Sequence, residues 1–260
     1  MEAKLELPKI KSRCKFSPDE LSYHLSRNLA LGIEDLYALY NEYHGSLAII
    51  NGGPSVDKHW DEIALLTMPI MAISRMVPAL VKHERFPNFV VSMDSSPDQK
   101  AGFNFRHQDA KYIMSTVANS DIVDKLCKGG YKVYLFDSYT DEDLHRRRQE
   151  AGYQVDTVIQ ASGSISVAAL GVAMFLGFRD LHVFGFDCMI EKADHHHSRW
   201  IAGKSHPEQM FELPLGGKTY LTSPPYLEFA QEAGALIEAG KANGLLDNIT
   251  FYGDTLVGRV

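Results

Sequence analysis

The stretch from residue 158 to residue 197 constrains the fold of this chain more than any other part of the sequence. It begins with a turn of small residues at 161–164 and continues as an apolar segment that carries no charge from 165 to 178. A helix without charged side chains is typical of an element that packs on several sides. A second apolar run at 181–186 predicts a buried strand, so the stretch reads as turn, buried helix and buried strand.

Polar residues stand at the ends of this helix and this strand. Ser162 or Ser164 can cap the helix, and Gly163 allows the backbone to turn tightly. Asp187 directly follows the strand. Three adjacent histidines come next: His195, His196 and His197. A polar turn opening a buried helix, beside a strand that ends in an acid, favours an active-site crevice in an open α/β fold. An ordinary crossover with a capped helix is the alternative interpretation.

Composition narrows the class of protein. The chain has 260 residues and a formal net charge of −7. Because phosphate backbones reward concentrated Lys and Arg, this charge argues against a general nucleic-acid binder, although it is compatible with a local basic pocket. Three widely spaced cysteines without a CxxC pair favour a reducing compartment. No stretch resembles a signal peptide or approaches the roughly 20 apolar residues of a membrane span, so we expect a cytoplasmic protein without a transmembrane segment.

A glycine-rich turn follows the first apolar run, residues 47–50, which suits a buried parallel strand. The helix after the turn is expected at residues 57–66. The two glycines allow a ligand to approach the backbone, and a helix start offers unpaired N–H groups to an anion. The motif matches neither GxGxxG nor a Walker loop, and a plain turn would also explain it. The turn consists of Asn51, Gly52, Gly53, Pro54 and Ser55.

A second acidic residue, Asp94, ends the strand predicted at residues 88–93. An acid at the carboxyl end of a parallel strand is well placed to hold ribose hydroxyls, a metal or a substrate hydroxyl. Alternatively, Asp94 caps the helix that follows it.

Strand and helix patterns alternate at least five times along the chain. The other strands are predicted at residues 68–73, 111–115, 131–136 and 248–252. This alternation predicts an α/β fold: a single Rossmann-like, doubly wound, mainly parallel sheet with helices on both faces. We expect a mobile loop at 204–215 and a hairpin turn at 216–219.

The region before the first strand predicts helices. Ser17, with Glu20 three residues later, forms a capping-box pattern, and leucines then recur at helical spacing. Residues 1–44 are therefore expected to be a mostly helical N-terminal extension that covers a sheet edge or makes an oligomer contact. Residues 45–260 are expected to form the α/β domain.

Four segments of the chain together resemble a known family. They are AIINGGPSVDKHWDEI, FPNFVVSMDSSP, ASGSISVAALGVAMFLGFRDLHVFGFD with the histidines after it, and GKTYLTSPPYLEFAQEAGALIEA. In order and spacing they are similar to the MptE-like domain, which archaeal hydroxymethyl-dihydropterin pyrophosphokinases share with the motility-accessory-factor (Maf) glycosyltransferases that modify flagellin. Bacterial sialyltransferases are a more distant likeness. The resemblance covers residues 45–255.

The resemblance implies nucleotide-linked chemistry, with ATP or a CMP-activated sugar as the donor. It implies a reaction centre at Asp187 and one of His195, His196 or His197. Asn51 stands where many relatives have a small residue, and the family usually has one histidine where this chain has three. The implied nucleotide-binding residues are Asn51, Gly52, Gly53, Pro54, Ser55, Asp94, Ser162, Gly163 and Ser164.

Two enzymatic hypotheses follow. In a glycosyltransferase, a histidine would take the proton of an acceptor hydroxyl, and backbone N–H groups of the two turns would stabilise the leaving phosphate. In a pyrophosphokinase, Asp94 and Asp187 would hold a Mg²⁺ that bridges the phosphates of ATP. The histidines would otherwise belong to a solvated loop or an adventitious soft-metal site.

A non-catalytic nucleotide-binding module is the third hypothesis. For all three we expect a small-molecule nucleotide, no permanently bound cofactor and no nucleic acid, with homo-oligomerisation through the N-terminal helices as a further prediction. The acceptor is unknown.

Overall fold

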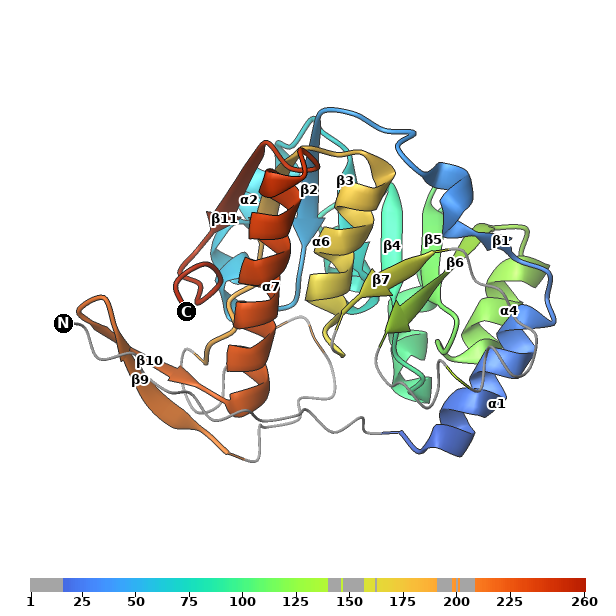
Figure 1. The fold of residues 1–260 in the computed structure, drawn as a ribbon. Helices are drawn as coiled ribbons and strands as arrows, with labels where there is room; N and C mark the ends of the chain where they lie inside the picture. The colour runs from blue at the N-terminus through green and yellow to red at the C-terminus, as the bar shows by residue number, and fades with distance from the viewer. Residues whose placement is uncertain are drawn as a thin grey trace.

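The computed structural model describes residues 16–139, 146, 157–161, 163–190, 198–199, 201 and 209–260. Its centre is a sheet of nine strands in which the paired strands run parallel (Figure 1). The order across the sheet is β1 (Glu34–Asp35), β6 (Lys132–Tyr139), β5 (Lys111–Ser115), β4 (Phe89–Ser92), β3 (Ile70–Ile73), β2 (Ser46–Ile50), β8 (Asp180–Phe184) and β11 (Asn248–Tyr252). The ninth strand, β7 (Val158–Gln160), pairs with the end of β6.

The chain winds outward from β2 in two directions. Strands β3 to β6 follow one another on one side of β2, and β8 and β11 lie on its other side. This is the doubly wound α/β arrangement that the sequence predicts. It places a change of winding direction between β2 and β8, where an open α/β sheet usually binds its ligand.

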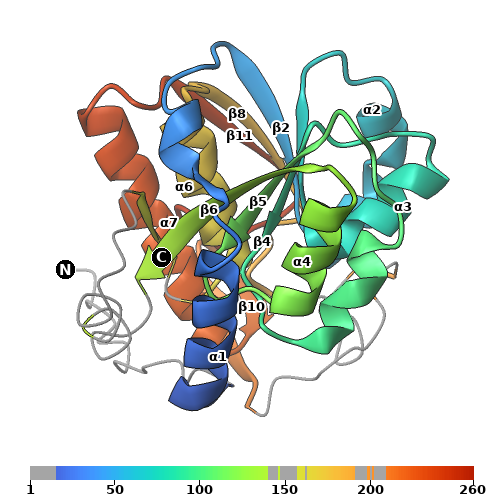
Figure 2. The same ribbon diagram turned by 90° about the vertical axis from the view of Figure 1, so that its right-hand side faces the viewer.

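Alternating residues of each strand point into two separate hydrophobic cores, one on each face of the sheet. Leu47 and Ile49 belong to the core beneath α6 (Ile165–Leu176) and α7 (Pro224–Ala242). Ala48 and Ile50 point to the opposite core, beneath α2 (Trp60–Ala64), α3 (Val77–Lys82) and α4 (Ser120–Lys128). The two-residue period of a strand explains why a short apolar run serves both faces. Figure 2 shows the sheet between its two helical layers.

Helix α6 is packed on several sides, as its lack of charge predicts. It contacts β2, β3, β4, β7 and α7, and eight of its residues are buried. Ser164 is its N-cap, and Gly177 ends it in a left-handed conformation with φ 102°. Because α6 lies between the parallel strands β7 and β8 in the chain, its N-terminus lies at the carboxyl edge of the sheet.

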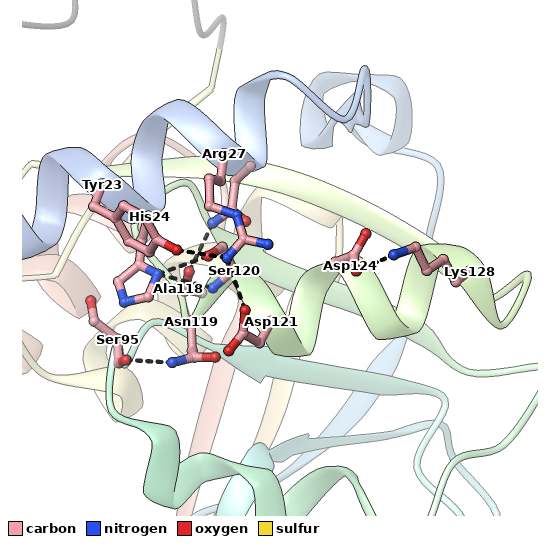
Figure 3. Close-up of polar contacts among 11 residues, drawn as sticks. Tyr23, His24, Arg27, Ser95, Ala118, Asn119, Ser120, Asp121, Asp124 and Lys128 are labelled. Carbon is pink, nitrogen blue, oxygen red and sulfur yellow. Dashed lines mark hydrogen bonds and ion pairs between the residues drawn. The ribbon is translucent and has the colours of Figure 1, made fainter.

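The N-terminal segment contributes to the sheet as well as to the helical layer. Helix α1 (Pro18–Leu29) begins with the predicted capping box of Ser17 and Glu20 and packs on α4 (Figure 3). The chain then adds β1 and a 3-10 turn, η1 (Leu36–Leu39), which the sequence analysis did not predict. The domain boundary at 44/45 stays a prediction.

A hairpin lies near the carboxyl edge of the sheet, to the left of the lower end of α7 in Figure 1. Strands β9 (Phe211–Leu215) and β10 (Lys218–Thr222) pair antiparallel, and Gly216 and Gly217 turn between them with φ of 58° and 77°. The predicted hairpin turn at residues 216–219 is therefore confirmed. The expected mobile loop at 204–215 is wrong for residues 211–215, because these residues form β9; residues 204–208 lie outside the described residues.

Short 3-10 helices replace some expected α-helices after the strands. They are η2 (Pro54–Lys58), η3 (Ser74–Met76) and η4 (Pro97–Phe103). The helix predicted at 57–66 is therefore a 3-10 turn followed by the five residues of α2. Within the part of the chain that the structure describes, none of the helices combines the length and the apolar character that crossing a bilayer requires.

Candidate functional site

The turns after β2 and β8 meet at the change of winding direction. The Gly53 N–H donates to the Gly185 carbonyl at 2.7 Å, and the Asn51 N–H donates to the Phe184 carbonyl at 2.8 Å. A Cβ on Gly53 would lie 2.6 Å from both the Gly185 oxygen and Asp187 Oδ2. Gly53 is therefore required for close packing of two protein segments.

Asp187 joins these two turns. Its Oδ2 accepts the Ser55 N–H at 2.8 Å, and its Oδ1 accepts the Ser55 hydroxyl. Both side chains are buried, and the Leu256 N–H donates to the Asp187 carbonyl at 3.0 Å. Both carboxylate oxygens thus bind the β2 turn, which suits a residue that positions this turn better than one that meets a substrate.

The hydrogen bonds within the turn alter one expectation. The Gly53 and Ser55 N–H groups are bonded to Gly185 and Asp187, and Pro54 has no N–H. The helix that would present further donors is the short η2. Two of the N–H groups that we expected to meet a phosphate are therefore already bonded within the protein.

The side chain of Asn51 is the exceptional group of this turn. It is 0% exposed, and among the described residues neither its Nδ2 nor its Oδ1 has a hydrogen-bond partner. Leaving a buried amide group unpaired costs about 1–3 kcal/mol. Native proteins seldom keep such groups without a reason, which makes Asn51 a candidate for contact with a ligand.

The start of α7 lies against the segment after β8. Thr222 Oγ1 donates to the Cys188 carbonyl at 2.9 Å, and the Ile190 N–H donates to the Leu221 carbonyl at 2.7 Å. Ser223, the N-cap of α7, is 1% exposed, and its hydroxyl has no partner in the part of the chain that the structure describes. No site residue is predicted from the sequence at the start of α7, although the segment containing Ser223 is one of the four that carry the family resemblance.

Asp94 lies elsewhere on the carboxyl edge, after β4. Its Oδ1 accepts the Ser96 N–H at 2.8 Å and its Oδ2 accepts Gln99 Nε2 at 2.7 Å, while Arg75 lies 3.6 Å from Oδ2. The alternative prediction, that Asp94 caps the helix after it, is wrong: Ser96 is the N-cap of η4, and Asp94 binds the Ser96 N–H and the Gln99 side chain instead.

The sheet order argues against one Mg²⁺ held by Asp94 and Asp187. Strands β4 and β8 are three places apart, which corresponds to roughly 14 Å at about 4.8 Å per strand. Ligands of one Mg²⁺ lie about 2.1 Å from the ion, so the two carboxylates do not fit a shared site. Among the described residues, no group of three or more His, Cys, Asp or Glu side chains could hold a metal ion.

The second predicted turn opens α6 at the same edge of the sheet. Gly163 is exposed with φ 85°, and Ser164 is buried and accepts the Val167 N–H at 3.4 Å. Among the described residues, no hydrogen bond joins Gly163 or Ser164 to the turn after β2. Ser162 lies outside the described residues.

His195, His196 and His197 also lie outside the described residues, but residues on either side of them are described. Ile190 pairs with Leu221. Ser198 donates its N–H to the Gly52 carbonyl at 2.8 Å and its hydroxyl to Asp57 Oδ1 at 2.7 Å. Ile201 covers Gly52, whose Cβ position it would contact. The flank after the histidines is thus attached to the β2 turn, and the flank before them to β10.

Comparison with known proteins agrees with this fold. Maf glycosyltransferase from Magnetospirillum magneticum AMB-1 is a structural neighbour with a TM-score of 0.63 and 14% sequence identity. The match covers 94% of this chain and 39% of that protein, so this chain corresponds to well under half of its neighbour's length. At this identity the likeness concerns the fold alone. A search of curated proteins found no match.

A family model provides the identification. The model described as "6-hydroxymethylpterin diphosphokinase MptE-like" matches residues 23–193, which is more than half of the chain. The matched region includes the turn after β2, the turn before α6 and the end of β8. The chain belongs to the MptE-like family.

Proposed function

We propose that this chain is a transferase that moves a sugar from a nucleotide-activated donor of the CMP type to an acceptor hydroxyl. The observation that carries this proposal is the buried, unpartnered carboxamide of Asn51 at the junction of β2 and β8. A carboxamide offers one donor and one acceptor side by side, as does the edge of a nucleobase. The place in the fold is the one at which doubly wound sheets bind nucleotides.

The chemistry of such a transfer needs a base and a leaving group. The acceptor oxygen forms the new bond to the sugar, the bond between sugar and donor phosphate breaks, and the nucleotide leaves with the electron pair. One of His195, His196 and His197 would take the acceptor proton, since the ordinary pKa of histidine, about 6.5, suits proton transfer near neutral pH. In this proposal Asp187 positions the β2 turn through Ser55.

The description of the family favours a second candidate, a Mg²⁺–ATP-dependent pyrophosphokinase that acts on a hydroxymethylpterin-like substrate. The separation of Asp94 from Asp187 in the sheet argues against the metal site that we expected for it. A kinase of this kind would need other ligands for its metal.

Calorimetry of the whole chain with CMP, CDP, UDP, GDP and ATP, each with and without Mg²⁺, tests the proposal. We expect CMP to bind without Mg²⁺, and Asn51→Ala to weaken this binding about ten-fold or more, because it removes two hydrogen bonds to the ligand. Asn248→Ala, at an exposed position at the start of β11, is the matched control and should bind CMP as the wild type does.

The alternatives predict different results. Binding of ATP only with Mg²⁺ would support the pyrophosphokinase, and CMP binding without transfer to any acceptor would support the non-catalytic module. If Asn51→Ala binds CMP as tightly as the wild type, Asn51 does not carry nucleotide recognition and the proposal loses its basis.

A further inference from the structure

The N-cap of helix α7 is Ser223, and its side chain does not accept the hydrogen bond that an N-cap side chain normally accepts. An N-cap serine normally accepts a hydrogen bond from the N–H of the second or third helical residue. The side chain of Ser223 makes no such bond, and its hydroxyl is buried at the helix N-terminus without a partner from any described residue. The first two residues of the helix, Pro224 and Pro225, have no N–H. The hydroxyl therefore remains as a donor or acceptor for another molecule.

A second hydroxyl comes from the first turn of the same helix. The ring of Tyr226 packs against the core beneath α6 and α7, and its hydroxyl has no hydrogen-bond partner among the described residues. Burial raises the pKa of this phenol, and the nearby Cys188 and Asp187 raise it further. Tyr226 thus stays protonated and neutral near pH 7, so its O–H is available as a donor.

The position of this helix start links it to the candidate site. Thr222 is bonded to Cys188, the residue after Asp187, and Asp187 holds the turn that carries Asn51. The carboxylate of Asp187 is covered by the N–H and O–H groups of Ser55, which reduces its repulsion of a nearby anion. The N-terminus of a 19-residue helix carries a partial positive charge.

We propose that Ser223 and Tyr226 bind an anionic group at the start of α7, namely the phosphate of the nucleotide donor. The inference rests on the proposed function for the identity of the ligand. The base or ribose would meet Asn51, while the phosphate would receive hydrogen bonds from the two hydroxyls. Neutral O–H donors at a helix N-terminus suit a phosphate because they supply hydrogen bonds without a fixed counter-charge.

The test measures CMP, cytidine and inorganic pyrophosphate binding to the whole chain by calorimetry. Tyr226→Phe and Ser223→Ala each remove one hydroxyl that has no protein partner, so both variants should fold with unchanged or slightly raised melting temperature. We expect each to weaken CMP and pyrophosphate binding about ten-fold, and to leave cytidine binding unchanged. Tyr40→Phe, on an exposed ring in the turn after β1, is the control and should leave all three affinities unchanged.

The two probes separate this inference from the proposed function. If pyrophosphate binds and both variants weaken it while CMP does not bind the wild type, the anion site stands and the CMP-type donor is wrong. If the variants bind CMP and pyrophosphate as the wild type does, or if the wild type binds neither, the anion site is overturned. Equal losses for CMP and cytidine would also overturn it, because they would assign the two hydroxyls to the nucleoside.

Discussion

Near β5, where α1 packs, hydrogen bonds from side chains connect the segments at the carboxyl edge of the sheet. Asn28 donates from Nδ2 to the Thr116 and Ala118 carbonyls at 2.9 and 2.8 Å. Asn119 Nδ2 donates to the Ser95 carbonyl at 2.9 Å, as Figure 3 shows. At the β2–β8 junction, by contrast, backbone hydrogen bonds and the close approach of Gly53 to Gly185 join the two turns directly. Side chains add the pair of Asp187 and Ser55 and the bond from the Ser198 hydroxyl to Asp57.

Two asparagines show what the difference means. Asn28 and Asn51 are both 0% exposed. The Nδ2 of Asn28 has two carbonyl acceptors, and its Oδ1 has no partner among the described residues. In the Asn51 side chain both polar atoms lack such a partner. Where backbone groups hold two segments together, polar side chains remain available for a ligand. Residue type and burial alone do not distinguish these two roles.

The largest expected effect concerns the close backbone approach at the junction. Gly53→Ala should lower the free energy of unfolding by about 3 kcal/mol, because the added Cβ meets the Gly185 carbonyl and Asp187 and overpacking costs about 1–3 kcal/mol. Urea denaturation measures this change. The control is Gly234→Ala, inside α7, where the nearest atom to an added Cβ lies 3.8 Å away; this change should stabilise the chain by up to about 1 kcal/mol. Equal stability of the two variants would contradict the role given to Gly53.

The next effect compares the two asparagines directly. Asn28→Ala should destabilise the chain by about 2 kcal/mol, since it removes two hydrogen bonds and leaves buried carbonyls without those donors. Asn51→Ala should change the unfolding free energy by less than about 1 kcal/mol, because no protein hydrogen bond is lost. Urea denaturation without ligand checks both values. A loss at Asn51 as large as that at Asn28 would mean that Asn51 supports the fold.

The smallest expected effect is a pH dependence of stability that arises where α1 packs on α4. His24 Nδ1 accepts the Ser120 N–H at 3.1 Å and so caps α4 from α1. Burial lowers the pKa of His24 below its ordinary value of 6.5, Arg27 lowers it too, and Asp121 and Glu20 oppose the shift. Because the folded state favours neutral His24, this contribution to stability is present above pH 6.5 and is lost as the pH falls through the lowered pKa.

Unfolding midpoints measured between pH 8 and pH 5 reveal this contribution. The variant His24→Gln keeps an acceptor for the Ser120 N–H but does not titrate, so its stability should fall less over the same range. An identical pH profile for the two proteins would show that His24 does not contribute.

Much of the fold could be predicted from the sequence because its signals are local. The apolar run at 111–115 and the pattern at 248–252 coincide with β5 and β11, and the capping box of Ser17 and Glu20 starts α1 as expected. Two-residue β1 carries too little pattern to be recognised, and β7 is only three residues long. Those strands form because neighbouring β6 supplies their partners.

The candidate site was predictable only in part. The sequence places Asn51, Gly53, Asp94 and Asp187 after strands, and therefore at one edge of the sheet. It does not show that Asp187 binds a residue 132 positions away, or that Asp94 binds its own turn. Nor does it reveal that Asn51 lacks partners, since this depends on what every neighbouring segment brings to the site.

The unpartnered amide of Asn51 has a consequence for the evolution of specificity. A rotation of about 180° about its last side-chain bond exchanges its oxygen and nitrogen. With no hydrogen-bond partner among the described residues to fix the orientation, the proposed nucleotide would select the one it needs. In that proposal, one unchanged turn could recognise bases with opposite patterns of donors and acceptors.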